Sequence, residues 1–429
     1  ISDLQTSPSK RSPAPPFTTS TLQQEAARKL GFSVSQTMVV AQKLYEAGKI
    51  SYMRTDSVNL SDEAQAGARQ QIVTAYGEKY VQPRQYKNKS ATAQEAHEAI
   101  RPTDFSVLDP GMDRNAKRLY ELIWKRAIAS QMADAELEKT TATIAISTNP
   151  KTFVATGEVV KFDGFLKVYI ESADEEDEEE NGKMLPPLAV GQILALDEMT
   201  ARQIFSRYPP RYTEASLVKK LEELGIGRPS TYAPTISTIQ KRGYVVKESR
   251  EGTEREYRLL KLKNNNIEKF TEKEIIGAEK NKLFPTNTAM VVNDFLVEHF
   301  PDITDYSFTS EIELEFDEIA AGKLEWRKMI DNFYKPFHKK VQQTEQVERS
   351  QVGKSRELGV DPKTGKKVYV KLGRFGAYVQ VGDNPDENGG EKPKFASLRP
   401  GQFIESITLE EALDLLKMPR QMGEFEGKP

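Results

Sequence analysis

One pattern occurs twice in this chain of 429 residues: a helix, a glycine, a second helix, another glycine and then a short apolar run. The glycines are Gly31 and Gly48 in the first copy, and Gly225 and Gly243 in the second. Glycine is favoured just after helices because it adopts a left-handed backbone conformation without strain. The pattern therefore predicts two helix-turn-helix units, each followed by a strand. Such units often dock on DNA, but helix pairs are also common in proteins that bind no nucleic acid.

Local signals place the elements of these two copies. Residues 20–23, Ser-Thr-Leu-Gln, have the spacing of a capping box and predict the start of the first helix. In the second copy, helices are predicted at about 213–224 and 230–242. The runs 244–248 and 255–262 that follow are predicted to pair as a wing-like hairpin.

The pattern changes along the rest of the chain. Apolar and polar residues alternate between 140 and 196, which predicts strands, and helical spacing returns from about 265 to 345. Two β-like runs and a capped helix then form a small C-terminal module. The length is too great for one compact core, so we predict a multidomain α+β fold with winged-helix-like helical domains, a β-rich region and a small α+β repeat.

Seven segments follow from these patterns. The first is rich in proline and serine, and the last resembles the start of the C-terminal module. Because the chain begins with Ile1 and stops inside that apparent repeat, we expect a fragment of a longer protein. The segments are a linker at 1–16, a helical domain at 17–136, a β-rich segment at 137–209, a second helical domain at 210–345, a linker at 346–357, the module at 358–420 and the start of a further repeat at 421–429.

Composition excludes some classes of protein. The chain has no cysteine, so disulfides and cysteine-bound zinc are excluded, which fits an intracellular setting. No apolar run is long enough to cross a bilayer, so we expect a cytoplasmic protein without a membrane partner. The formal net charge of -3 decides nothing about nucleic acid, because acidic surface can balance a basic groove.

Tyr52 and Arg54 follow the first helix pair, in a run predicted as a strand from 49 to 53. Side chains two apart on a strand point to the same face. A phenol is almost fully protonated at neutral pH, so attack on phosphorus requires a neighbour that favours the phenolate. A guanidinium does this and also binds phosphate. Taken alone, the pair is more simply a half-buried edge-strand tyrosine beside a solvated arginine.

A second segment also suits phosphate. Residues 95–103 are predicted as a short helix ended by Pro102, with His97 and Arg101 four residues apart on one face. Histidine exchanges a proton near neutral pH, so His97 could donate to a phosphate oxygen. The alternative is a surface histidine paired with Glu98 or Glu95.

A third segment lies before the last helix of the second copy. Backbone N–H groups at a helix N-terminus bind anions, and glycines there permit a close approach. The alternative is ordinary helix capping by Ser230. The residues that would form this cradle are Gly227, Arg228, Ser230 and Thr231.

These segments occur together, at 44–57, 95–103 and 224–233. In this order and spacing they resemble bacterial DNA topoisomerase I, a type IA topoisomerase, over about residues 16 to 337. Residues from 358 onward resemble the cysteine-free C-terminal repeat of that family. Because three motifs occur jointly, the alternatives for each one lose most of their weight.

The resemblance implies a role for each residue. Tyr52 is implied to attack a phosphodiester of single-stranded DNA and form a 5′-phosphotyrosine link, with Arg54 stabilising the phosphoryl group. His97 and Arg101 are implied to bind or orient DNA phosphates. Contacts with the strand near the break are implied for Gly227, Arg228, Ser230 and Thr231.

The implied activity is ATP-independent relaxation of negatively supercoiled DNA by cleavage, strand passage and religation. The implied fold is a torus in which residues 137–209 belong to a β-rich arch and residues 210–345 to a strand-binding domain. The implied partner is a single-stranded segment of negatively supercoiled DNA, and we expect a monomer. The alternative is a non-catalytic DNA-binding module built from the two helix-turn-helix units.

One departure from the family is large. In the family, an acidic Toprim domain binds magnesium near the tyrosine, and this sequence contains neither that domain nor a D-x-D-x-E motif. The resemblance therefore implies a magnesium cofactor bound outside this sequence and none within it. We expect the chain alone to cleave and reseal DNA poorly.

Overall fold

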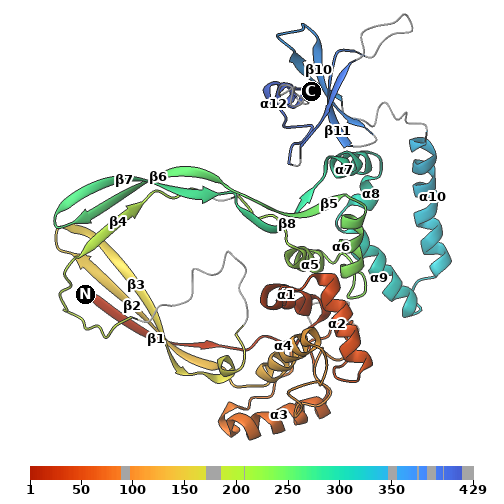
Figure 1. The fold of residues 1–429 in the computed structure, drawn as a ribbon. Helices are drawn as coiled ribbons and strands as arrows, with labels where there is room; N and C mark the ends of the chain where they lie inside the picture. The colour runs from red at the N-terminus through yellow and green to blue at the C-terminus, as the bar shows by residue number, and fades with distance from the viewer. Residues whose placement is uncertain are drawn as a thin grey trace, which may run out of the picture. The chain divides into compact units, whose positions relative to one another are not determined.

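A computed structural model describes residues 1–87, 97–170, 185–206, 208–345, 355–373, 376–383, 393–399 and 401–417. The chain forms two compact units. Helices and strands both contribute, which confirms the predicted α+β class (Figure 1). The first unit contains residues 1–223, 227–234 and 249–282, and the second contains residues 224–226, 235–248 and 283–429.

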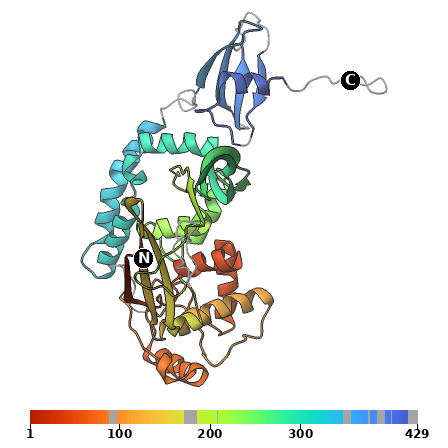
Figure 2. The same ribbon diagram turned by 90° about the vertical axis from the view of Figure 1, so that its left-hand side faces the viewer.

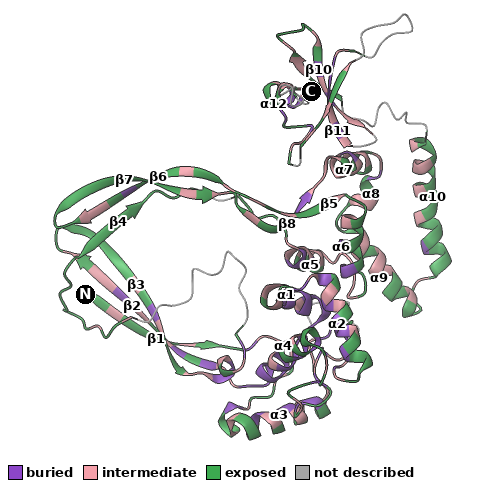
Figure 3. Cartoon of the chain, in the orientation of Figure 1, coloured by how far each residue is buried: buried purple, intermediate pink, exposed green. Residues whose placement is uncertain are grey.

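Four helices form the main core of the first unit. Each contributes side chains that are fully buried, such as Leu22, Leu44, Ile72 and Ile123, and burial of one such side chain stabilises the fold by roughly 1.5–3 kcal/mol. Buried residues gather in these helices in Figure 3. The helices are α1 (Thr19–Leu30), α2 (Val34–Glu46), α3 (Asp62–Tyr76) and α4 (Arg114–Ser130), with short 3-10 turns η1 (Glu78–Tyr80) and η2 (Gly164–Lys167).

The first helix begins earlier than predicted. Thr18, not a residue of 20–23, is the N-cap of α1: Thr21 N–H donates to the Thr18 hydroxyl, and Thr18 N–H donates to the Thr21 hydroxyl. The predicted end is confirmed, since Gly31 is left-handed with φ 71°. Several hydroxyl residues in succession can cap this helix, and the backbone bond from Thr19 to Thr55 selects the earlier start.

The first residues of the chain are not a linker. They form β1 (Asp3–Arg11), which pairs antiparallel with β2 (Ala135–Ile146), and β2 pairs with β3 (Asn149–Phe162). The prediction for 1–16 was wrong because β1 is an edge strand with mostly exposed residues, so it has no apolar alternation. The strands predicted after residue 140 are confirmed by β2 and β3.

The second helix pair is present in chain order as predicted. Its helices are α5 (Glu214–Glu223) and α6 (Tyr232–Lys241), and β5 (Val245–Arg250) follows. α5 contacts α1 within the first unit, where the Ser20 hydroxyl donates to Glu222 at 2.6 Å.

The wing-like hairpin after this pair was a wrong prediction. β5 pairs with β8 (Glu279–Pro285), whereas β6 (Thr253–Lys263) pairs with β7 (Asn266–Ile276) and β4 (Glu198–Arg202). Asn264 and Asn265 connect β6 to β7 with φ of 51° and 59°, the conformation that two-residue hairpins require. This asparagine pair, not the glycine at 252, makes the hairpin.

Helices return in the second unit only from residue 287. The helical prediction for 265–285 was wrong because β7 carries Ile267 and Phe270 three residues apart on an exposed ribbon, which imitates helical spacing. The helices are α7 (Asn287–His299), α8 (Pro301–Thr304), α9 (Phe308–Ala320) and α10 (Trp326–Thr344).

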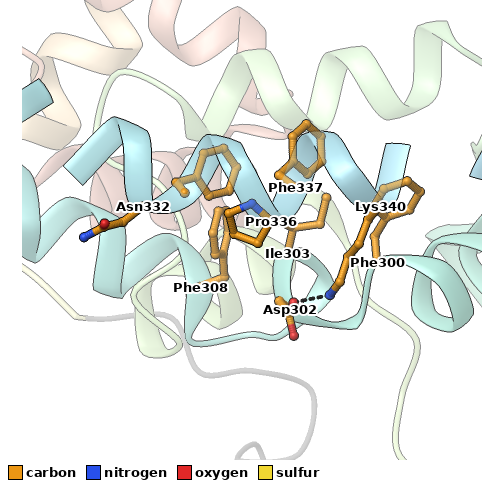
Figure 4. Close-up of a pocket in the computed structure, with 9 residues that line it drawn as sticks. Phe300, Asp302, Ile303, Phe308, Asn332, Pro336, Phe337 and Lys340 are labelled. Atoms are coloured by element: carbon orange, nitrogen blue, oxygen red, sulfur yellow. Dashed lines mark hydrogen bonds and ion pairs between the residues drawn. The ribbon is translucent and has the colours of Figure 1, made fainter. Parts of the chain in front are cut away.

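An aromatic cleft of about 170 Å³ lies among the last three of these helices (Figure 4). The rings of Phe333 and Phe337 stack with centroids 5.3 Å apart, and Lys340 pairs with Asp302 at the rim. The remaining lining residues are Phe300, Ile303, Phe308, Asn332 and Pro336. None of the residues predicted to bind phosphate lines this cleft.

The C-terminal module is a four-stranded sheet in the order β12-β11-β10-β9 with one helix against it (Figure 2). Thr408 caps that helix through a capping box with Glu411, as predicted. The predicted linker at 346–357 was too long because β9 begins at residue 355, and the segment 421–429 lies outside the described residues. The elements are β9 (Ser355–Val360), β10 (Lys367–Gly373), β11 (Gly376–Val381), β12 (Lys394–Ser397) and α12 (Leu409–Leu415).

Candidate functional site

Tyr52 and Arg54 lie in irregular backbone after α2, not in the predicted strand. Only Ile50 forms a β-bridge, with Pro102, and beyond Ser51 the backbone of the segment bonds to Thr19 and not to a neighbouring strand. Burial nevertheless alternates, since Met53 is 1% exposed whereas Tyr52 is 37% exposed and Arg54 is also exposed. Both polar side chains therefore point out of the core, in agreement with the predicted shared face.

The segment that carries His97 and Arg101 is extended from residue 97 onward, so the predicted helix was wrong; residues 95 and 96 lie outside the described part. Ala99 N–H donates to Asn59 O and Ile100 N–H donates to Phe17 O, both at 2.8 Å. These partners from distant segments replace the bonds that a helix would make. His97 and Arg101 are therefore not related by helical spacing.

Tyr52 nevertheless meets His97. Their ring centroids are 5.8 Å apart with a tilt of 45°. Tyr45, in the last turn of α2, makes an edge contact with Tyr52 at 5.3 Å. Sequence reasoning missed Tyr45, although an exposed aromatic residue at the end of the preceding helix was a usable signal.

The backbone of Arg101 lies at the same site, whereas its side chain already makes hydrogen bonds to neighbouring residues. Its Nε donates to Glu98 at 2.5 Å, and its Nη1 donates to Pro102 O at 3.0 Å. Burial alone would raise the pKa of the Glu98 carboxyl, but hydrogen bonds from Arg101 and Ser61 outweigh burial and lower that pKa. Glu98 is thus a charged partner that orients Arg101 and balances part of its charge.

Arg54 differs from Arg101 in this respect. Within the described residues, its guanidinium pairs with no carboxylate, and it is exposed. A positive charge beside Tyr52 that is not balanced locally can act on an incoming phosphate.

The turn before α6 is closed by its own bonds. Arg228 N–H donates to the Thr231 hydroxyl at 2.8 Å, and Thr231 N–H donates to Arg228 O at 2.9 Å. Gly227 has φ 83°, and a Cβ there would lie 2.8 Å from the Thr231 hydroxyl, so only glycine fits. α6 begins at Tyr232, so Ser230 does not cap it. Two of the predicted anion donors, the N–H groups of Arg228 and Thr231, are used within the turn. Proximity of this turn to Tyr52 stays a prediction.

Neither a metal cluster nor a membrane helix is found within the described part of the chain. No group of three or more His, Asp and Glu side chains there could hold a metal ion. The magnesium that the resemblance implies therefore has no fitting donor set among these residues. No helix there is long and apolar enough to span a membrane.

Comparison with protein families gives two matches. A sequence model described as DNA topoisomerase matches residues 1–257 and 263–331, and a topoisomerase C-terminal repeat matches residues 361–425. The chain belongs to the DNA topoisomerase family. This finding confirms the resemblance that the three motifs indicate.

Individual relatives of this topoisomerase chain support the same family. DNA topoisomerase 1 of Xylella fastidiosa (strain 9a5c) is 44% identical over 446 residues, covering 100% of this chain and 50% of that protein. DNA topoisomerase 1 of Rickettsia felis is 37% identical over 500 residues, covering 96% of this chain and 60% of that protein. The chain therefore spans about half the length of the first of these relatives.

A solved structure also matches the fold. Full-length topoisomerase I from Thermotoga maritima aligns with a TM-score of 0.63 and 32% identity. The alignment covers 94% of the topoisomerase chain described here and 61% of the Thermotoga chain. The predicted fold family is thus confirmed.

Proposed function

We propose that this topoisomerase chain carries the nucleophile of a DNA strand-cleavage site, and that Tyr52 is the nucleophile. The observation that carries the proposal is the exposed phenol of Tyr52 in ring contact with His97, on a segment in which the side chains of Ile50, Met53 and Thr55 are buried. Arg54 lies two residues away, and among the described residues its guanidinium pairs with no carboxylate. A nucleophile, a group that can exchange a proton and a cation are thereby gathered on one segment and its neighbour.

In the proposed reaction, the Tyr52 phenolic oxygen attacks phosphorus of a single-stranded segment. The new bond joins this oxygen to phosphorus, the bond from phosphorus to the 3′ oxygen breaks, and a proton equivalent to the one lost by the phenol ends on that 3′ oxygen. The product is a 5′-phosphotyrosine with a free 3′-hydroxyl. The number of phosphoester bonds is unchanged, so the reverse reaction reseals the strand without ATP.

The neighbouring residues take supporting roles in this proposal. Arg54 stabilises the charge on the phosphoryl oxygens, and His97 holds or protonates a phosphate oxygen. Arg101 contributes only its remaining N–H groups, because Glu98 and Pro102 engage the others. Strand contacts beyond the break are assigned to Gly227, Arg228, Ser230 and Thr231.

For the whole protein the proposed activity is relaxation of negatively supercoiled DNA in the cytoplasm. Several finer statements stay predictions: single-strand specificity, a monomeric state, the need for magnesium and poor activity of this chain alone. A plasmid relaxation assay with the chain by itself checks the last of these, and the same assay with the full-length protein, with and without added magnesium, checks the need for magnesium.

The test of the nucleophile is a covalent-adduct assay on the full-length protein. The substrate is a single-stranded oligonucleotide labelled at its 3′ end, because the proposed link leaves the 3′ fragment on the protein. Tyr52→Phe removes the attacking oxygen and is expected to lower adduct formation by roughly 10⁴-fold or more, the scale of other nucleophile deletions. Tyr45→Phe removes the neighbouring phenol and is expected to leave adduct formation intact.

Two outcomes would overturn the assignment. Adduct formed by Tyr52→Phe would mean that another residue attacks. Salt-dependent DNA binding by the parent protein without any adduct or relaxation would favour the alternative, a non-catalytic DNA-binding module.

A further inference from the structure

The segment of Tyr52 lacks regular secondary structure, so something else must satisfy and fix its backbone. The described contacts identify two hydroxyl groups. One is on Thr19 at the start of α1, and the other is on Ser51, directly before Tyr52. They bind the backbone on opposite sides of Tyr52, whose side chain is exposed.

Thr19 binds the segment on its C-terminal side. Its hydroxyl donates to Met53 O at 2.8 Å, with Thr55 O 3.1 Å away, and accepts from Thr55 N–H at 2.9 Å. Its backbone N–H, one of the donors that a helix leaves free in its first turn, donates to Thr55 O at 2.9 Å. Thr19 is 0% exposed, so water does not compete for these bonds. The backbone around Arg54 is thereby attached to helix α1.

Ser51 binds the segment on its N-terminal side. Its hydroxyl donates to Ala99 O at 2.8 Å and accepts from Arg101 N–H at 2.9 Å, while its own N–H donates to Arg101 O at 2.9 Å. The residue before Tyr52 is thus joined to the extended segment that presents His97. These bonds set how Tyr52 and His97 face each other.

We propose that the Thr19 and Ser51 hydroxyls are positioning groups that hold Tyr52 and Arg54 in the geometry for attack on DNA. The inference rests on the proposed function and deepens it. Both hydroxyls are already engaged in bonds to backbone groups, so neither is free to touch the substrate. Each acts instead through the backbone of the residues that it binds. In-line attack requires the phenolic oxygen in line with the leaving oxygen, and a displacement of about 1 Å can lower a rate by roughly 10²-fold.

The experiment measures the rate of adduct formation at saturating oligonucleotide, and separately the dissociation constant, in the full-length protein. Thr19→Val keeps the shape of the side chain and removes its hydroxyl. We expect adduct formation to slow by roughly 10- to 100-fold while the dissociation constant is nearly unchanged. Thr19→Ser restores the hydroxyl and is expected to restore most of the rate. Ser51→Ala is expected to slow the reaction in the same way.

Thr37→Val is the matched control. Thr37 is also 0% exposed and its hydroxyl donates to Ser33 O at 3.0 Å, inside α2 and away from the Tyr52 segment. It is expected to lower thermal stability less than Thr19→Val, because its hydroxyl makes a single bond, and to leave the cleavage rate unchanged. If Thr19→Val yields too little folded protein, Ser51→Ala decides alone.

Normal rates in both Thr19→Val and Ser51→Ala would overturn the inference, as would an equal loss of rate in Thr37→Val. These failures differ from failure of the proposed function, which would show as adduct formation by Tyr52→Phe.

Discussion

The helices of the two units differ in what they bury. In the first unit, α1 to α4 share one cluster of buried apolar side chains that includes Ile72 and Ile123. In the second unit, α9 buries no residue and α10 buries only Met329. α9 and α10 instead expose large apolar side chains, with Leu314 at 49% and Trp326 at 53% (Figure 3).

The candidate nucleophile belongs to the well-packed group. Met53, beside Tyr52, is a member of the buried cluster, and Thr19 joins the same segment to α1. Helices with few buried contacts open more easily than those in a packed core. We infer that the geometry of the candidate site depends on the packed helices of the first unit, whereas α9 and α10 tolerate change.

The largest expected effect is in the packed group. Ile123→Ala deletes a side chain that is 0% exposed, and we expect it to lower the free energy of unfolding of the first unit by roughly 2–5 kcal/mol, through lost burial and the cavity left behind. The chain has two tryptophans, Trp124 in α4 and Trp326 in α10. In a Trp326→Phe background, denaturant unfolding followed by Trp124 fluorescence reports the first unit alone.

Glu121→Ala, on the exposed side of α4, is the control for that measurement. It removes only a surface ion pair with Lys125, so the expected change is below about 1 kcal/mol. A loss as small for Ile123→Ala would contradict the view that α1 to α4 form a tightly packed core.

A smaller effect is expected from pH. Burial, together with the nearby Asp104 carboxylate, raises the pKa of Tyr120 to about 12. An unfolded tyrosine titrates near pH ~10, so above that pH the unfolded state loses its proton first and stability falls until the folded group also titrates. The loss reaches roughly 2–3 kcal/mol by pH 12.

Tyr120→Phe should remove this part of the pH dependence. The measurement is the free energy of unfolding of the first unit at pH 9, 10 and 11 for the parent and the variant. Tyr169, whose pKa burial also raises, is present in both proteins and cancels in the difference. Identical pH dependence in the two proteins would show that Tyr120 is not shielded from water as the packed core requires.

How much of the fold was predictable depends on whether an element is fixed by local or by distant contacts. Ser33 and Thr408 cap their helices through side-chain bonds three residues along the chain, so these starts can be read from local sequence. Strand pairing joins distant segments: β1 pairs with β2 across more than a hundred residues, and β5 pairs with β8 in place of the nearer β6. No local pattern encodes these partners, and exposed strands lack the alternation that would mark them.

The candidate site also has one part that local sequence predicted and another part that it did not. Tyr52, Arg54 and His97 were proposed from residue type and spacing, but no local pattern predicted the ring contact between Tyr52 and His97. The helix predicted to place His97 and Arg101 on one face was wrong, because the partners of Ala99 and Ile100 lie in other segments. Thr19 was not predicted at all, since its hydroxyl reaches residues 34 and 36 positions away.

The smallest effect is expected in α9. Leu314 is half exposed and α9 buries no residue, so Leu314→Ala removes little apolar contact and should change local stability by no more than about 0.5 kcal/mol. Hydrogen exchange of peptides that cover residues 308–320, in the full-length protein and its variant, measures this directly. Exposed Leu260 in β6 offers a matched Leu→Ala control in the first unit, where a similarly small change is expected.

A loss of 2 kcal/mol or more at Leu314, near the roughly 2–5 kcal/mol of a buried position, would mean that this face of α9 is covered in the full-length protein. The contrast between the two groups of helices would then describe this chain alone and not the full-length protein.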